Sequence, residues 1–207
     1  MHISEGVLSA PVLLSGGALA VLGLAYSLRK MPWQHIMSVG VLAAGFFVAS
    51  LAHIPIGPSS VHLILGGLMG AALGWAAFPA ISVAMFLQAL LLQFGGLTSL
   101  GANISIVGYP AVFCGLALRP FLASASFKIR NLGAFFCGFL SVLFSAALSA
   151  TALAASGADF FSSAWMLFTA HVPVMFIEGL LTVAIVNFVI RVTPDLLGLA
   201  GTTRYEV

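Results

Sequence analysis

The chain consists of long apolar segments separated by short stretches rich in Pro, Gly or charged residues. Such interruptions mark the ends of helices. A helix needs about 20 apolar residues to cross a bilayer, and most of these segments approach that length. The alternating apolar and polar pattern of a membrane β-barrel does not occur. We therefore predict seven helices, at about residues 7–28, 34–52, 60–76, 79–94, 104–122, 132–156 and 164–192.

Composition strengthens this interpretation. Apolar residues make up 61% of the 207 positions and charged residues only 6%, whereas a soluble domain carries about 25% charge. The sequence thus predicts an all-α integral membrane protein, with one transmembrane domain over residues 1–207. The net charge of +2 and the scattered basic residues argue against nucleic-acid binding.

Charge placement predicts the orientation. Basic residues near helix ends mark the cytoplasmic side. With seven spans, all seven basic residues fall on one side, which places the N-terminus outside and the C-terminus inside a prokaryotic inner membrane. An even number of spans would divide them between the two sides. The basic residues are Arg29, Lys30, Arg119, Lys128, Arg130, Arg191 and Arg204.

The opening Met-His-Ile-Ser-Glu-Gly carries a carboxylate and no basic residue. A signal peptide would begin with a basic region, so we expect residues 7–28 to be a retained helix and Met1 to be the working N-terminus. The Met1 amine, the His2 amide nitrogen and the His2 imidazole can then chelate one ion. His62 is a candidate fourth ligand, and a square of nitrogens suits Ni(II) or Cu(II) and can be forced on Co(II). The alternative is that His2 is a solvated residue on a frayed end.

Other polar residues admit both functional and structural interpretations. His53 lies across the outer connection from His62, as a further ligand or as an interface residue. His171 and Glu178 are two turns apart on one helix face. They could form a structural hydrogen-bond network or support a polar path, since ionisable groups within a membrane usually face the protein interior. The connection 95–103, which ends at Asn103, could close over a site or form an ordinary turn.

The repeated G-x-x-x-G of Gly66, Gly70 and Gly74 predicts close approach of another helix. The sequence lacks a nucleotide-binding G-x-x-x-x-G-K-[ST], a zinc H-E-x-x-H and a nucleophile G-x-S-x-G. We therefore expect no enzyme, no catalytic residue and no resident cofactor. Three alternatives to a metal-binding membrane protein remain. They are a stand-alone secondary transporter or channel, an intramembrane hydrolase and a purely structural membrane partner.

Four motifs resemble the CbiM/NikM family, the substrate-binding membrane components of energy-coupling-factor transporters for cobalt and nickel. They are the opening Met-His-Ile-x-Glu-Gly, the Ser-Ser-Val-His-Leu around His62, the Gly-Gly-Leu-Thr-Ser-Leu-Gly-Ala-Asn at 95–103, and His171 to Glu178-Gly179. The resemblance covers essentially the whole chain. Ser4 differs from the residue common in the family but is not an expected ligand.

The resemblance implies uptake of a divalent metal ion, with Co²⁺ as the first candidate and Ni²⁺ as the second. The ion would be bound by Met1, His2 and His62. It also implies a transmembrane coupling subunit, cytoplasmic ATPase subunits and a small accessory membrane protein as partners. The 95–103 loop would pack against the site. The residues expected to support the site are Asn103, Ser60, Glu5, His171, Glu178 and His53.

Overall fold

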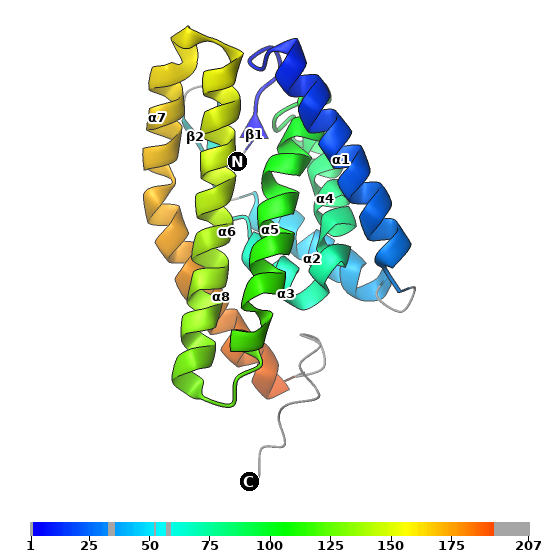
Figure 1. Ribbon diagram of the computed structural model, residues 1–207, viewed down its shortest axis with the longest axis vertical. Coiled ribbons are helices and arrows are strands. Elements are labelled where there is room, and N and C mark those ends of the chain that lie inside the picture. The colour runs from blue at the N-terminus through cyan, green and yellow to red at the C-terminus, as the bar shows by residue number, and fades with distance from the viewer. Residues whose placement is uncertain (1, 33–35, 52, 57–58, 193–207) are drawn as a thin grey trace.

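The computed structural model describes residues 2–32, 36–51, 53–56 and 59–192, with the backbone alone described for 53–56 and 59–62. The chain forms a bundle of helices that encloses a small antiparallel sheet (Figure 1). Its strands are β1 (His2–Ile3), β2 (His53–Ile56) and β3 (Ser59–His62). Its helices are α1 (Ala10–Lys30), α2 (Ile36–Ala49), α3 (Gly66–Leu73), α4 (Ala77–Leu91), α5 (Leu100–Leu122), α6 (Phe127–Ser156), α7 (Phe161–Ala170) and α8 (Val172–Val192), with short 3₁₀ turns η2 (Gly74–Ala76) and η3 (Ala158–Phe160).

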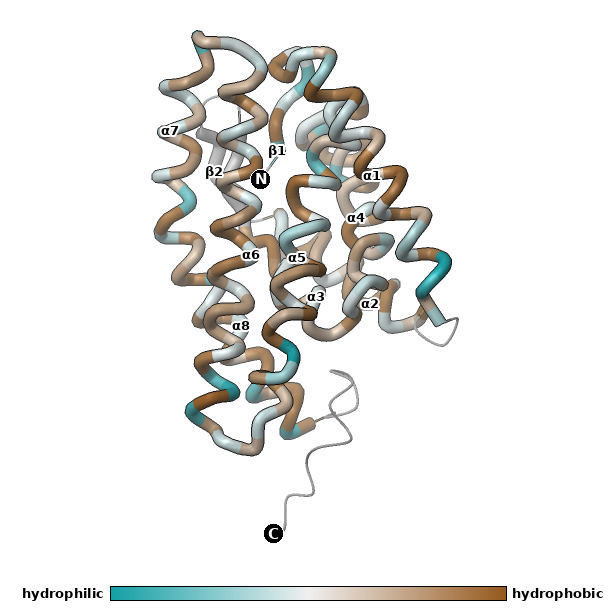
Figure 2. Tube along the Cα trace, in the orientation of Figure 1, coloured by the Kyte–Doolittle hydropathy of each residue, from teal (hydrophilic) through white to brown (hydrophobic). Residues whose placement is uncertain are grey.

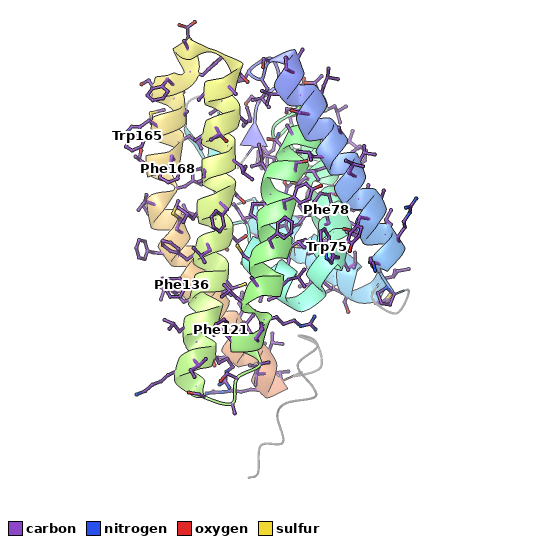
Figure 3. All side chains as sticks on the ribbon, in the orientation of Figure 1. Trp75, Phe78, Phe121, Phe136, Trp165 and Phe168 are labelled. Atoms are coloured by element: carbon purple, nitrogen blue, oxygen red, sulfur yellow. The ribbon has the colours of Figure 1, made fainter. Side chains whose placement is uncertain are left out.

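Helix α5 is the hub of the bundle, because α1, α3, α4 and α6 all pack against it. Small residues allow these close approaches. Phe78 of α4 is fully buried, and its ring fills the space left by Gly23 of α1 and Gly108 of α5. Trp165 of α7, by contrast, points away from the bundle and is 66% exposed (Figure 3). A surface with many exposed apolar side chains is the one expected beside lipid.

Among the described residues, five helical segments are long and apolar enough to cross a membrane. Helix α2, with 14 residues, is a shorter apolar helix. Apolar positions dominate the helices, and hydrophilic positions gather toward their ends (Figure 2). The all-helical membrane architecture is thus confirmed, while the seven spans and the sidedness stay predictions. The membrane candidates are Ala10–Lys30, Gly66–Leu91, Leu100–Leu122, Phe127–Ser156 and Ala158–Val192.

Two predicted helices differ from those observed. The helix expected from about residue 60 begins at Gly66, because residues 59–62 form the central strand β3 instead. The helix expected over 164–192 is divided at His171 into α7 and α8. The first difference arises from strand pairing, and the second lies at the buried His171. Hydropathy indicates neither of them.

Candidate functional site

The N-terminal strand β1 lies inside the bundle, between α6 and α1 in the view of Figure 1. His2 is 3% exposed and Ile3 is 1% exposed. β1 runs antiparallel to β3, with His2 opposite Ser60 and Ile3 opposite Ser59. The interpretation of residues 2 and 3 as part of a frayed, solvated terminus is therefore wrong. Each strand pair satisfies backbone groups that could not be left without partners in an apolar interior.

Helix α5 fixes the backbone of β1 through Asn103. The Ile3 N–H donates to Asn103 Oδ1 over 3.0 Å, and Asn103 Nδ2 donates to the Ile3 carbonyl over 3.1 Å. Ser99 Oγ donates to the same carbonyl over 2.8 Å. Both side chains are almost fully buried. The first turn of α5 thus holds residue 3 at both of its backbone hydrogen-bonding groups, and so determines where residue 2 lies.

The segment between α4 and α5 closes over β1. The His2 ring lies tilted against the Phe94 ring, with 5.9 Å between ring centroids. Gly95 has φ +77°, and a Cβ there would lie 2.7 Å from Asn103 Nδ2 and 3.4 Å from the His2 Cβ. Only glycine combines this backbone conformation with so close an approach. The loop expected to pack against the site therefore does lie against His2.

Glu5 ties the turn after β1 to the same loop. The Thr98 N–H donates to Glu5 Oε1 over 2.9 Å. Hydrogen bonds from the Thr98 backbone, and then from the Thr98 side chain, lower the pKa of Glu5 below its ordinary value of 4.5. The carboxylate is thus charged at neutral pH. On the solvent-exposed side, it fastens the turn after β1 to the loop that carries Thr98.

Glu178 of α8 supports the other end of β3. Its carboxylate accepts from the Ile64 N–H and from the Leu65 N–H, with 2.9 Å to Oε1 and 3.0 Å to Oε2 for Leu65. Leu65 has φ +49° and precedes the first residue of α3. A buried carboxylate therefore caps the start of α3, two residues after His62. Glu178 thus bonds to the backbone next to position 62, and its role in supporting a site stays a prediction.

His171 lies fully buried at the junction of α7 and α8. Its Nδ1 is 2.7 Å from the Leu167 carbonyl oxygen. A carbonyl oxygen only accepts, so Nδ1 carries the proton in this contact and Nε2 presents its lone pair. His171 and Glu178 are both buried, as expected for ionisable residues within a membrane, but their hydrogen bonds go to different partners. His171 thus belongs to the α7–α8 junction rather than to the cap of α3.

Several predicted site residues have no described side chain. Met1 lies outside the described residues, as do the side chains of His53, Ser60 and His62. Their backbone register is nevertheless defined, with His53 opposite His62 in the β2–β3 pair. Among the described residues no three His, Cys, Asp or Glu side chains form a metal-binding group. The ligand set of Met1, His2 and His62 consequently stays a prediction.

The glycines of the G-x-x-x-G repeat lie within the bundle. Gly66 faces Ser141 of α6, and Gly70 lies directly against the backbone of Ala111 and Gly115 of α5. Gly74 differs, because its φ of +56° serves the turn η2. At the first two positions the close contact is intramolecular.

Sequence reasoning missed three features of the site. Ser99 and Phe94 contact β1 directly, but a serine or a phenylalanine in an apolar chain carries no distinctive signal. The β2–β3 pair was interpreted as an outer connection because Pro55, Gly57 and Pro58 suggest a loop. The available signal was the pair of His53 and His62, which flank this segment. They lie opposite each other in the β2–β3 register.

Residues 2–196 match the family model described as the cobalt uptake substrate-specific transmembrane region, CbiM. A Haemophilus influenzae protein with a metal-transport name is 36% identical, over 95% of this chain and 97% of its own length. The Pelobacter propionicus cobalt transport protein CbiM 2 is 32% identical, over 96% of this chain and 94% of its own. The Rhodobacter capsulatus fused nickel transport protein NikMN is 35% identical, over 65% of this chain and 38% of its own.

The fold also matches a solved structure. The crystal structure of a transition metal transporter superposes with a TM-score of 0.79 at 22% identity, covering 100% of both chains. At this identity the match concerns the fold alone. Together with the long apolar helices, the comparisons identify a multi-pass membrane protein, and a bacterial inner membrane fits the bacterial relatives.

Proposed function

Because the chain belongs to the CbiM family, we propose that it captures a divalent transition-metal ion for uptake. We take Co²⁺ as the preferred ion because the matching family model describes cobalt uptake, and Ni²⁺ as the next because a relative carries a nickel-transport name. In this proposal the chain is the substrate-binding membrane subunit of an ATP-driven energy-coupling-factor importer. The metal is its cargo rather than a resident cofactor.

The observation that carries the proposal is the register of β1 on β3. His2 lies opposite Ser60, and His62 is two residues farther along the same strand. Positions two apart on a strand share a face, and so do directly paired positions. The register therefore places positions 2 and 62 as diagonal neighbours on one face of the sheet. From position 60 to 62, β3 also runs toward the N-terminal end of β1.

We infer that the ligands are the Met1 amine, the His2 amide nitrogen and imidazole, and the His62 imidazole. These four nitrogens suit square-planar coordination. All must be deprotonated to bind, so metal binding should release protons and weaken as pH falls through the histidine range. The burial of His2 and the hydrogen bonds to Ile3 support a preorganised N-terminus.

The partners in this proposal are a transmembrane coupling subunit, cytoplasmic ATPase subunits and a small accessory membrane protein. The chain has no nucleotide-binding P-loop of its own, so ATP hydrolysis requires another subunit. The Rhodobacter relative is named as a fusion, and this chain covers only 38% of it. The fusion of a second component to this relative supports the proposal that the present chain works as part of an assembly.

Calorimetry on the purified chain tests the site. We compare the native N-terminus with a chain extended by four Gly before Met1, and titrate Co²⁺ and Ni²⁺ separately at pH 5 and pH 8. This extension moves the amine too far from His2 to share a chelate with it, whereas a single Gly would create a new four-nitrogen chelate from Gly-Met-His. We expect tight binding by the native chain, a loss of about 100-fold on extension, and weaker binding at pH 5.

The matched control adds the same four Gly after Val207, which should leave metal affinity unchanged. If the N-terminal extension also leaves affinity unchanged, the amino-terminal chelate is wrong. If the chain alone takes up metal in ATP-free vesicles, the stand-alone transporter is the better interpretation.

A further inference from the structure

His171 presents a nitrogen lone pair to the interior of the bundle. The side chain is fully buried, and its Nδ1 lies 2.7 Å from the Leu167 carbonyl oxygen. Its Nε2 is buried as well and has no hydrogen-bond partner among the described residues. A buried acceptor left without a partner is costly. A histidine that ligates a metal has this same arrangement, with one ring nitrogen fixed by a carbonyl and the other free to bind.

The face of α8 that carries His171 is turned toward the central strand. His171 and Glu178 are two helical turns apart, so they lie on one face, about 10 Å apart along the axis. Glu178 accepts from the Ile64 and Leu65 N–H groups, which closely follow β3. Met175 lies between the two on the same buried face. This face is therefore directed at β3, the strand on which β1 pairs.

The register of α8 on α6 gives the depth of His171. The two helices run antiparallel (Figure 1), and a Cβ at Gly138 of α6 would meet Glu178 and Thr182 of α8. From that contact, each step toward the start of α8 corresponds to a step toward the end of α6. His171 consequently lies at about the level of Ala147 on α6.

The register of α5 on α6 gives the depth of Asn103 in the same way. Gly133 of α6 lies against Phe121 of α5, and farther along the same pair of helices Ile106 and Leu148 line one groove. Asn103 therefore lies level with the turn of α6 that follows Leu148. That level is about 6 Å from the level of His171 along the axis of α6.

His2 lies on the inner side of Ile3, the residue that α5 binds. The chain after β1 leads to the C-terminal end of α6, where the Ser9 N–H donates to Ser156 Oγ over 3.0 Å. His2 is thus one strand residue, about 3.3 Å, deeper than Ile3. His2 and His171 are then at nearly the same depth in the bundle.

Helix α6 also offers polar atoms at this depth. Ser141 and Ser145 lie one turn apart on its buried face, and neither hydroxyl has a hydrogen-bond partner among the residues that the structure describes. Ser141 borders the start of α3, since a Cβ at Gly66 would lie 2.9 Å from its Oγ. Ser145 is close to the level of His171. Since buried polar groups are normally satisfied, these atoms indicate a polar occupant between α6, α8 and the sheet.

We propose that His171 Nε2 is a further ligand of the captured metal, at an axial position of the square of nitrogens. This inference rests on the proposed function. Ni²⁺ in a square that includes a deprotonated amide stays four-coordinate, because its axial orbital is filled. The axial orbital of low-spin Co²⁺ holds one electron fewer, so Co²⁺ gains more from a fifth nitrogen. His171 therefore favours Co²⁺ over Ni²⁺.

Electron paramagnetic resonance of the full-length protein loaded with Co²⁺ tests the coordination. In low-spin Co²⁺ the unpaired electron lies along the axis, so an axial nitrogen nucleus splits each cobalt line. We expect this splitting in the wild type and its loss in His171→Leu and His171→Gln. His171→Gln retains an amide that can donate to the Leu167 carbonyl, so it should fold even if His171→Leu does not. Met175→Leu, on the same buried face, is the matched control and should keep the splitting.

Calorimetry on the same variants measures selectivity. We expect Co²⁺ affinity to fall by about 10–100-fold in both His171 variants, at least the loss seen when a supporting residue is removed. Ni²⁺ affinity should stay within about threefold, a small change in binding free energy. Met175→Leu should leave both affinities unchanged.

Three results would overturn this inference alone, provided that the four-Gly extension still abolishes binding. A wild-type spectrum without the axial splitting would show that no fifth nitrogen binds. Splitting retained in the His171 variants would assign the axial nitrogen to another residue. Equal losses of Co²⁺ and Ni²⁺ affinity would show a purely structural role. If the wild type binds neither ion, or if the extension has no effect, the proposed function fails together with this inference.

Discussion

At the scale of single residues, the amide of Asn103 defines the position of the N-terminal strand. It both accepts from and donates to Ile3 in a buried setting. Replacement by Leu, which has a similar shape, would leave the buried Ile3 N–H without its acceptor. We expect Asn103→Leu to lower the free energy of unfolding by about 1–3 kcal/mol. On the proposed function, it should also weaken metal affinity by about 10–100-fold, as supporting residues commonly do. Thermal unfolding in detergent and calorimetry measure the two effects.

Ser105→Ala is the matched control for Asn103→Leu. Ser105 lies on the same helix and donates to the Gly16 carbonyl over 2.7 Å, so its loss removes an α5–α1 hydrogen bond without touching β1. It should cost some stability and leave metal affinity unchanged. Equal losses of metal affinity in both variants would mean that Asn103 acts through general stability rather than through the N-terminus.

At the scale of elements, α8 positions the segment that joins β3 to α3. Glu178 accepts from Leu65 and Ile64, immediately after the strand that carries His62. Glu178→Leu would leave these backbone N–H groups without their acceptor. We expect a loss of about 1–3 kcal/mol in the free energy of unfolding, since two buried N–H groups would lose their acceptor. Metal affinity should fall as well, because position 62 would lose its anchor.

Thr182→Val separates this role from helix packing. Thr182 is fully buried one turn farther along α8, and its Oγ1 donates to the Glu178 carbonyl over 2.7 Å. The variant keeps the carboxylate of Glu178 in place. It should therefore retain metal affinity, and an affinity as low as that of Glu178→Leu would contradict an anchoring role for the carboxylate.

At the scale of the whole molecule, the distribution of basic residues predicts which end faces the cytoplasm. Lys128 lies in the first turn of α6, and Asp159 lies in η3, just after α6 ends. Both side chains are exposed. A cysteine in place of Asp159 should react with a membrane-impermeant maleimide in intact cells. A cysteine in place of Lys128 should react only after permeabilisation. Cys114 and Cys137 are buried and give little background; the reverse labelling pattern would overturn the predicted orientation.

Hydropathy predicted most of the helices closely. The first was expected over 7–28 and spans Ala10–Lys30, and the fifth was expected over 104–122 and spans Leu100–Leu122. The family resemblance, drawn from the opening residues and from 95–103, is confirmed by the match over residues 2–196. These features depend on composition and local motif, which a sequence displays directly.

The remaining features depend on contacts between distant segments. The strand at 59–62 could not be predicted from its own residues, because it exists through pairing with His2–Ile3 and His53–Ile56. The contact of Glu178 with Leu65 joins residues more than a hundred positions apart. Asn103 was expected to support the site, but its two hydrogen bonds to Ile3 required the fold.

The pairing of β1 with β3 has a consequence for the order in which the molecule is assembled. Residues 2 and 3 gain their β3 partners only after residues 59–60 have been made, and Ile3 gains Asn103 only after residue 103 has been made. Contacts so distant in sequence form late, because the chain must close a long loop before they stabilise it. The bundle of helices can thus be largely complete while β1 is still unplaced. Arrival of the N-terminus is a late event in folding, and a chain that stalls before it would be helical, inserted and inactive.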